Sequence, residues 1–301
     1  MLHPGLYEKL INTETAEALS LIPEERKATA SVDTAEAPVV LSEYVADAVR
    51  KSLEDLGEHE PEKQVALVNN IISLLGHKEQ TVEEPAEQLT ALLDEKDARV
   101  ANGKATAKDL VRPETSIAMS SLFTGAVHEP AMFAELKKEI VSADRIDMLV
   151  SFIKFSGLRL ILDELTEFAQ RGGRLRIITT SYMGVTEVKA VEELRKLPNT
   201  EIRVSYDTKR TRLHAKTYVF YRDTGFTTAY IGSSNLSNAA ISSGMEWNVK
   251  VTAKDQPDIL RKVMATFDAY WNSEEFESYD EGSRDRLSEA LKAEKYHGDH
   301  P

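Results

Sequence analysis

Cysteine is missing altogether from this chain of 301 residues. Its absence excludes disulfide scaffolds, thiolate zinc sites and cysteine nucleophiles, and it fits a reducing cytoplasm, where we expect the protein to act. No window approaches the roughly 18 uninterrupted apolar residues of a membrane span. The N-terminus also lacks the basic stretch and long apolar run of a secretory signal. We therefore expect no membrane partner.

Positive charge is also scarce, since 37 Lys and Arg face 50 Asp and Glu, a net charge of −13. The deficit is uneven along the chain. Residues 1–112 hold 12 basic and 22 acidic side chains, residues 113–271 hold 21 and 19, and residues 272–301 hold 4 and 9. Only the middle region is therefore not repelled by a polyanion. Within it, residues 203–216 carry five basic side chains against one acid, which is either a solvated basic loop or a contact for nucleic acid.

The first third of the chain has the periodicity of amphipathic helices. Apolar side chains recur at intervals of three and four in residues 42–57 and 61–76, and each segment ends in glycine. Residues 84–96 predict a third helix. We interpret residues 1–112 as an acidic α-helical domain that serves protein interaction or supports a dimer.

From residue 113 onward, strand and helix patterns alternate. This alternation predicts βαβ units, an α/β fold and a mixed, largely parallel sheet flanked by helices. Expected strands cover residues 145–153, 174–182, 200–206 and 245–253, a hairpin turns at "RDTG", and expected helices cover residues 129–143, 157–173, 185–198 and 256–276. We assign residues 113–276 to this domain and residues 277–301 to an acidic C-terminal tail. Trp247 and Trp271 are expected to pack between the last helix and the sheet.

Two cationic side chains stand two residues apart in "LHAKTYVF", residues 213–220. If this stretch is a strand, His214 and Lys216 share one face about 7 Å apart. The like charge of the lysine favours neutral imidazole, the nucleophilic form. Both side chains also suit the oxygens of a phosphate group. Taken alone, however, an H-x-K pair on a strand is usually structural.

Small polar residues follow in "IGSSNLSN", residues 231–238. Ser233 or Ser234, together with Asn235, offers neutral hydrogen-bond donors at the C-terminal end of a strand, where sites of α/β proteins gather. Glu246, at the start of the next expected strand, is a candidate acceptor for the second N–H of the histidine. The alternatives are ordinary turn chemistry and a solvent-facing glutamate.

H-x-K followed by G-S-x-N, on a hairpin within an α/β domain, resembles the phospholipase D superfamily, and the later glutamate resembles its nuclease branch. The resemblance places His214, Lys216, Ser233, Asn235 and Glu246 at the catalytic positions of the family. The aspartate often found five positions after the lysine is replaced by a tyrosine at position 221, which disfavours a phospholipase more than a nuclease.

Four longer segments resemble the phospholipase-D-like domain fused to the N-terminus of bacterial superfamily 2 helicases. They are "SFIKFSGLRL", "TTSYMG", "VSYDTKRTRLHAK" and "AYIGSSNLSNAA". The chain contains no G-x-x-x-x-G-K-[ST] motif, so a helicase would be a further domain or a partner.

The resemblance implies phosphodiester cleavage without a metal or other cofactor, through a covalent phosphohistidine on His214. Because the chain has a single H-x-K, it also implies a homodimer that supplies a second histidine. DNA is the favoured substrate, with RNA as an alternative. The expected phosphate contacts are Lys154, Lys209, Arg210 and Arg212. Two other functions stay open: a nucleic-acid-binding or dimerisation module that does not cut, and a phospholipid hydrolase or transferase.

Overall fold

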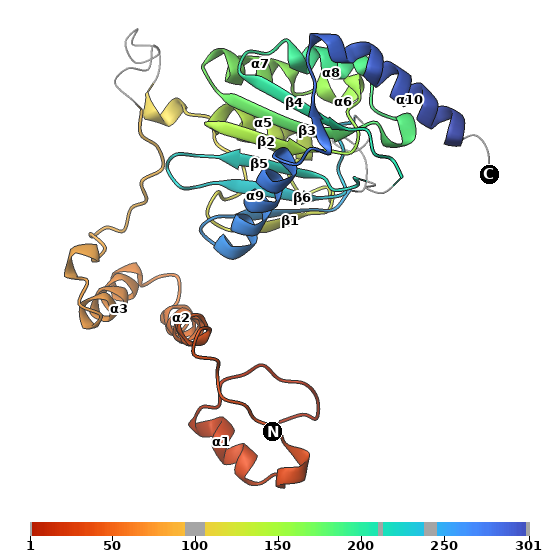
Figure 1. Cartoon of the computed structure of the whole chain (residues 1–301). Coiled ribbons are helices and arrows are strands. Elements are labelled where there is room, and N and C mark those ends of the chain that lie inside the picture. The colour runs from red at the N-terminus through yellow and green to blue at the C-terminus, as the bar shows by residue number, and fades with distance from the viewer. Residues whose placement is uncertain (1, 94–105, 210–212, 238–245, 299–301) are drawn as a thin grey trace. The chain divides into compact units, whose positions relative to one another are not determined.

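The computed structural model describes residues 2–93, 106–209, 213–237 and 246–298 of the chain (Figure 1). Contacts divide the chain into two compact units, Met1–Thr90 and Ala91–Pro301. Residues 106–112 thus belong with the α/β unit and not, as expected, with the helical one. Each unit is described by itself.

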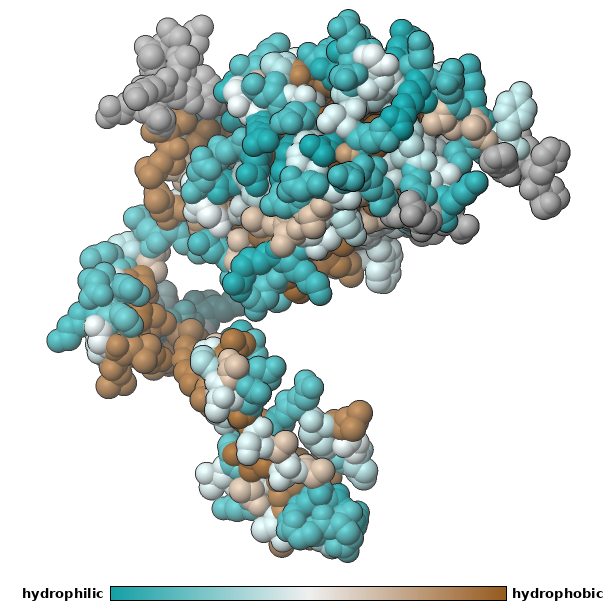
Figure 2. Space-filling view, viewed as in Figure 1, coloured by the Kyte–Doolittle hydropathy of each residue, from teal (hydrophilic) through white to brown (hydrophobic). Residues whose placement is uncertain are grey.

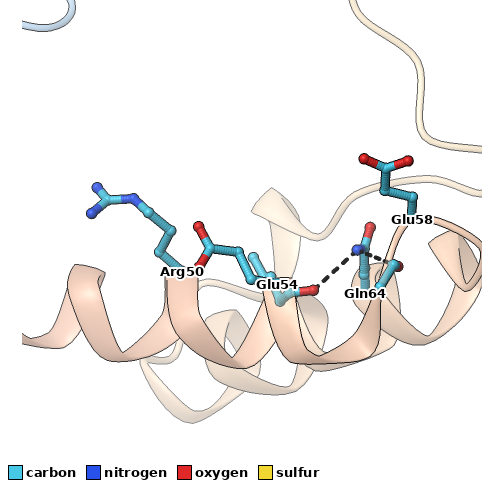
Figure 3. Close-up of a pocket in the computed structure, with 6 residues that line it drawn as sticks. Arg50, Glu54, Glu58 and Gln64 are labelled. Carbon is cyan, nitrogen blue, oxygen red and sulfur yellow. Dashed lines mark hydrogen bonds between the residues drawn. The ribbon is translucent and has the colours of Figure 1, made fainter.

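The N-terminal unit is built from three α-helices, α1 Thr13–Ser20, α2 Ala37–Leu56 and α3 Pro61–Leu74, with short 3-10 turns η1 Glu24–Arg26 and η2 Lys78–Gln80. Gln64 joins α3 to the end of α2, because its Nε2 donates to the carbonyl oxygens of Leu53 and Gly57 at 3.2 and 3.0 Å (Figure 3). Much apolar surface stays exposed on this unit (Figure 2), including Val45 on α2 and Leu74 on α3.

The helix expected over residues 84–96 is wrong for its described part, since residues 84–93 form no helix. Leu89 and Leu92 stay 78% and 77% exposed. Because most helical stability in proteins comes from packing an apolar face, a stripe without a partner does not hold a helix.

An eight-stranded sheet forms the centre of the second unit, in the order β1-β7-β6-β5-β2-β3-β4-β8 (Figure 1). The strands are β1 Ser121–Phe123, β2 Arg145–Leu149, β3 Arg174–Thr180, β4 Thr200–Ser205, β5 Thr217–Tyr221, β6 Thr228–Gly232, β7 Asn248–Thr252 and β8 Phe276–Ser278. The helices are α5 Met132–Ser142, α6 Phe155–Leu158, α7 Leu162–Gln170, α8 Val188–Arg195, α9 Pro257–Trp271 and α10 Arg284–Gly298, with 3-10 turns η3 Ala107–Asp109, η4 Tyr182–Gly184 and η6 Glu281–Ser283. The expected α/β class and flanking helices are confirmed.

The sheet is mixed, as expected, but it is not largely parallel. Only β2, β3 and β4 pair in parallel, and the five remaining pairings are antiparallel. Parallel neighbours need a crossover, and helices α6 to α8 supply two of them. No helix occurs in the described part of the chain between β4 and β5, and β5, β6 and β7 then pair as antiparallel neighbours.

Helices cover both faces of the sheet. On one face α5, α7 and α8 bury the main core, which includes Ile140, Phe168, Val191 and Tyr230. On the other face α9 places Phe267 and Trp271 against Leu149 and Ile178, and Leu260 against Val219 and Ala229. The expectation for Trp271 is therefore confirmed.

Buried charges join α5 to the strands beside it. Glu139 on α5 is fully buried and accepts hydrogen bonds from Arg222 at 2.6 Å, Thr228 at 2.8 Å and Tyr230 at 2.9 Å. Lys250 on β7, also fully buried, forms an ion pair with it at 2.9 Å. The carboxylate holds a pKa below its ordinary value, because Arg222 and Lys250 together outweigh the opposing effect of burial.

Residues 277–301 were expected to be an acidic tail, and this is wrong for their described part. Strand β8 pairs with β4, and Leu287 and Leu291 of α10 are buried in the main core. Thr208 donates a hydrogen bond to Glu294 of α10 at 2.6 Å. The acidic side chains that suggested a tail share this helix with an apolar stripe, which covers the α/β unit.

Candidate active site

His214 and Lys216 lie in direct contact immediately before β5. The Lys216 Nζ atom is 2.9 Å from His214 Nδ1 and donates to the His214 carbonyl oxygen at 2.5 Å. Strand β5 begins only at Thr217, so the expected strand over residues 213–216 is wrong. The long lysine side chain folds back onto the imidazole, so Nζ contacts the ring instead of standing about 7 Å away.

Lys216 is only 5% exposed, whereas the neighbouring His214 is exposed to solvent. Burial lowers the pKa of the Lys216 ammonium, and the negative charge of Glu246 works in the opposite direction. The backbone of the lysine is held too, since Gly232 N–H donates to its carbonyl oxygen at 3.2 Å. The pair therefore presents a fixed cation beneath an accessible histidine.

Ser233 is exposed and lies where strand β6 ends. Its N–H donates to Trp247 O at 3.1 Å, and its Oγ accepts from Trp247 N–H at 3.2 Å. Gly232 before it needs to be glycine, because an added Cβ would stand 2.1 Å from the Trp247 carbonyl oxygen. This close approach of two strands sets the position of the serine.

Ser234 is fully buried and belongs to the core. Its Oγ accepts from Asn248 Nδ2 at 2.7 Å, and its carbonyl oxygen accepts from the Tyr218 hydroxyl at 3.0 Å. Of the two serines, only Ser233 is open to a ligand.

Asn235 is half-buried and is positioned by a segment distant in the sequence. Its Oδ1 accepts the N–H of Phe152 at 3.0 Å, and the Phe152 ring stands edge-on to the His214 ring with centroids 6.5 Å apart. The Lys154 N–H donates to Leu236 O at 2.9 Å. Residues 151–154, which follow β2, therefore connect the asparagine to the histidine, a link that the sequence analysis missed.

Glu246 lies half-buried directly before β7. Its charge acts on Lys216 and raises the pKa of the buried Tyr218 hydroxyl, for which burial is the larger cause. Within the described residues, Glu246 makes no hydrogen bond to His214, whose Nδ1 is occupied by Lys216. Its expected role in orienting the imidazole stays a prediction.

The four expected phosphate contacts are only partly described. Lys209 is exposed, and Lys154 is half-buried at the start of α6. Arg210 and Arg212 lie outside the described residues. In the described ranges, no three His, Asp or Glu side chains gather in a way that would hold a metal ion, and no helix is both long and apolar enough to cross a bilayer.

Tyr221, at the position of the family aspartate, lies at the far end of β5 from His214. It is 9% exposed, and its hydroxyl donates to Asp147 Oδ2 at 2.8 Å. This tyrosine therefore serves the packing of the sheet, away from the candidate site.

Comparison with protein families gives a match over residues 136–271 to the family described as "Cardiolipin synthase, PLD-like domain". The match supports a phospholipase-D-like domain in that segment, which contains all five candidate residues. No curated protein matches the chain.

Solved structures similar to this chain include NucT from Helicobacter pylori, at 20% identity and a TM-score of 0.43, covering 54% of this chain and 99% of NucT. Nuc from Salmonella typhimurium, a phospholipase D family member, is 21% identical with a TM-score of 0.41 and covers the same shares. The archaeal chromatin protein TrmBL2 is 15% identical with a TM-score of 0.35, covering 88% of this chain and 80% of that one.

Proposed function

We propose that this protein is a phosphodiesterase that cuts nucleic acid, DNA in the first place, without a metal ion. The observation that carries the proposal is the contact between Lys216 Nζ and His214 Nδ1 at 2.9 Å, with Ser233 and Asn235 directly after the adjoining strand β6. One exposed nucleophile with several fixed donors around it suits a phosphate group that must be attacked and whose charge must be neutralised.

In the first step, Nε2 of His214 attacks phosphorus, a P–N bond forms and the bond to the leaving oxygen breaks. Attack requires the lone pair on Nε2 and the proton on Nδ1. In the free protein Lys216 donates to Nδ1, so the neutral imidazole carries its proton on Nε2. When a phosphate binds, the Lys216 ammonium donates to the non-bridging oxygens instead. The Nε2 proton then passes to water, water returns a proton to Nδ1, and Nδ1 donates it in a hydrogen bond to Glu246. Asn235 and Ser233 donate to the oxygens of the phosphate.

The leaving oxygen needs a proton, and water must later be activated to break the P–N bond. Among the seven histidines, only His214 stands in an H-x-K motif. We assign the second acid–base group to the same histidine of another copy, so that a homodimer completes the site. The N-terminal helical unit is proposed to support this dimer or to hold a partner, and a helicase is the proposed partner.

The central test compares wild-type protein with His214→Ala in EDTA, on single-stranded and duplex DNA and on bis(p-nitrophenyl) phosphate. We expect cleavage by the wild type, none by His214→Ala, and full activity in His128→Ala, which removes an exposed histidine outside the site. Denaturation in alkali should trap the phosphoryl group on His214, because a P–N bond survives base and is hydrolysed by acid. Activity that survives His214→Ala, or that EDTA abolishes, contradicts the mechanism.

The alternatives predict different outcomes in the same assays. A binding module holds DNA without cutting it, and a phospholipid hydrolase or transferase turns over lipid in vesicles but not DNA. Subunit mixing tests the shared site: after exchange of subunits, excess His214→Ala protein should suppress wild-type activity, whereas independent monomers would be unaffected. Copurification with an ATP-dependent unwinding activity tests the helicase partner.

A further inference from the structure

Trp247 was expected to pack between the last helix and the sheet, and this is wrong. Its side chain is 63% exposed, whereas Trp271 is only 6% exposed. Tryptophan is highly buried on average in folded proteins. An open indole next to a candidate site therefore calls for a ligand or a partner.

The backbone of Trp247 is fixed to the candidate site. It follows Glu246 directly, and it exchanges hydrogen bonds with Ser233 at 3.1 and 3.2 Å. This pairing continues the ladder of β6 and β7, in which Gly232 lies opposite Asn248. Strand alternation places the indole on the same side as Val249, two residues later.

That side of the sheet carries a row of cross-strand partners. Leu122 on β1 lies opposite Val249 on β7, Val249 opposite Ile231 on β6, and Ile231 opposite Thr217 on β5. Leu122 and Val249 are each 45% exposed. With Trp247 they form an open apolar surface along the strand ends.

The row leads into a groove of about 260 Å³ beneath α9. Thr217 and Ile231 line it together with Ala215, which stands between His214 and Lys216. From α9 the lining includes Ile259 and Lys262. Apolar surface and a cation therefore border the backbone segment that carries the proposed nucleophile.

We propose that Trp247 is a stacking platform for an unpaired base next to the cleaved phosphate, so that the substrate is single-stranded nucleic acid. This inference rests on the proposed function and narrows its substrate class. A base whose phosphate occupies the His214 site meets the indole and the apolar row, while Lys262 is placed for a neighbouring phosphate. Stacking on aromatic rings accepts any base but needs one that is free of a duplex.

Binding is measured in the His214→Ala protein, so that no turnover interferes. Of the two tryptophans, Trp247 is exposed and Trp271 is buried. A base stacked on Trp247 should therefore quench the fluorescence of Trp247. We expect an oligodeoxynucleotide of about ten nucleotides to quench fluorescence, and Trp247→Phe in the same background to remove that quenching. Trp247→Ala should weaken single-strand binding about tenfold, the loss typical of one base–aromatic stack. Tyr296→Ala, which removes an aromatic 77% exposed on α10, should leave binding unchanged.

Cleavage separates this inference from the proposed function. Trp247→Ala should cut single strands about tenfold less efficiently and keep wild-type cleavage of the same strand with abasic sites beside the cut, which offers no ring to stack. Equal losses on the normal and the abasic strand, or a change from dimer to monomer in sedimentation, would overturn the stacking role; the second result would assign the indole to self-association. Quenching by DNA without hydrolysis of any diester by the wild type would refute the proposed function but keep the binding role.

Discussion

Asn235→Asp separates the two ends of one side chain. In the structure Asn235 Oδ1 accepts the Phe152 N–H at 3.0 Å, so the Nδ2 amide is the donor that remains for a phosphate oxygen. Aspartate has the same shape and keeps the acceptor for Phe152. It loses the donor and sets a negative charge against the substrate.

Removal of one donor to a developing oxyanion lowers kcat by about 10²–10³. We therefore expect Asn235→Asp to fold like the wild type and to hydrolyse bis(p-nitrophenyl) phosphate at least about 100-fold more slowly. Asn235→Ala removes donor and acceptor together, and the unpaired Phe152 N–H should also cost about 1–3 kcal/mol of stability. Steady-state kinetics and urea unfolding of the three proteins measure both effects. Activity of Asn235→Asp within tenfold of the wild type would refute the assignment.

Four further predictions concern charge and packing in the α/β unit. Glu139→Ala leaves Arg222 and Lys250 buried without their carboxylate, so urea unfolding should show a loss of about 3–5 kcal/mol; a loss below about 1 kcal/mol would contradict the network, since exposed pairs contribute no more. The pKa of Glu139 is lowered in the folded protein. Its contribution to the free energy of unfolding is therefore complete above the unfolded pKa of about 4.3 and is lost as the pH falls through the folded pKa. Unfolding of the wild type and of Glu139→Gln measured across acidic pH should show this difference. Burial lowers the pKa of Lys216, so kcat/KM should decline on the alkaline side below the ordinary lysine value of about 10.4, and a decline unchanged in Lys216→Arg would assign it to another group. Gly232→Ala forces a Cβ against Trp247 O and should cost about 1–3 kcal/mol and most of the activity; wild-type stability would show that the strands separate freely.

Local patterns in the sequence predicted most elements of the α/β unit. The apolar spacing of residues 256–276 and the turn at "RDTG" correspond to α9 and to the β5–β6 hairpin. The hairpin register, with Thr217 opposite Ile231, brings the H-x-K end next to the G-S-x-N end, as the motif required. Short elements such as β1 and β8 were missed because three residues carry no period.

Contacts between distant segments could not be predicted. Phe152 and Asn235 are 83 residues apart in the sequence, and nothing in either stretch indicates the other. The same holds for Lys216, since the alternation of a strand fixes which face a side chain takes but not how a long side chain folds back over the end of that strand. The exposure of Trp247 depends on which elements pack against the start of β7, which the local pattern of residues does not state.

The antiparallel strands, where the prediction failed most, are what assemble the candidate site. His214 and Lys216 precede β5, whereas Phe152 follows β2. These two ends meet because β5 runs antiparallel to β2, with Thr217 opposite Leu149. Strands β6 and β7 are antiparallel as well. Their pairing brings Ser233, directly after Gly232, and Trp247, directly before Asn248, to the same edge of the sheet. Had β5 continued the parallel order of β2 to β4, its N-terminal end would lie at the opposite edge, about 16 Å away for a five-residue strand. One change of strand direction therefore brings these polar residues to one edge of the sheet, where the proposed phosphate site lies.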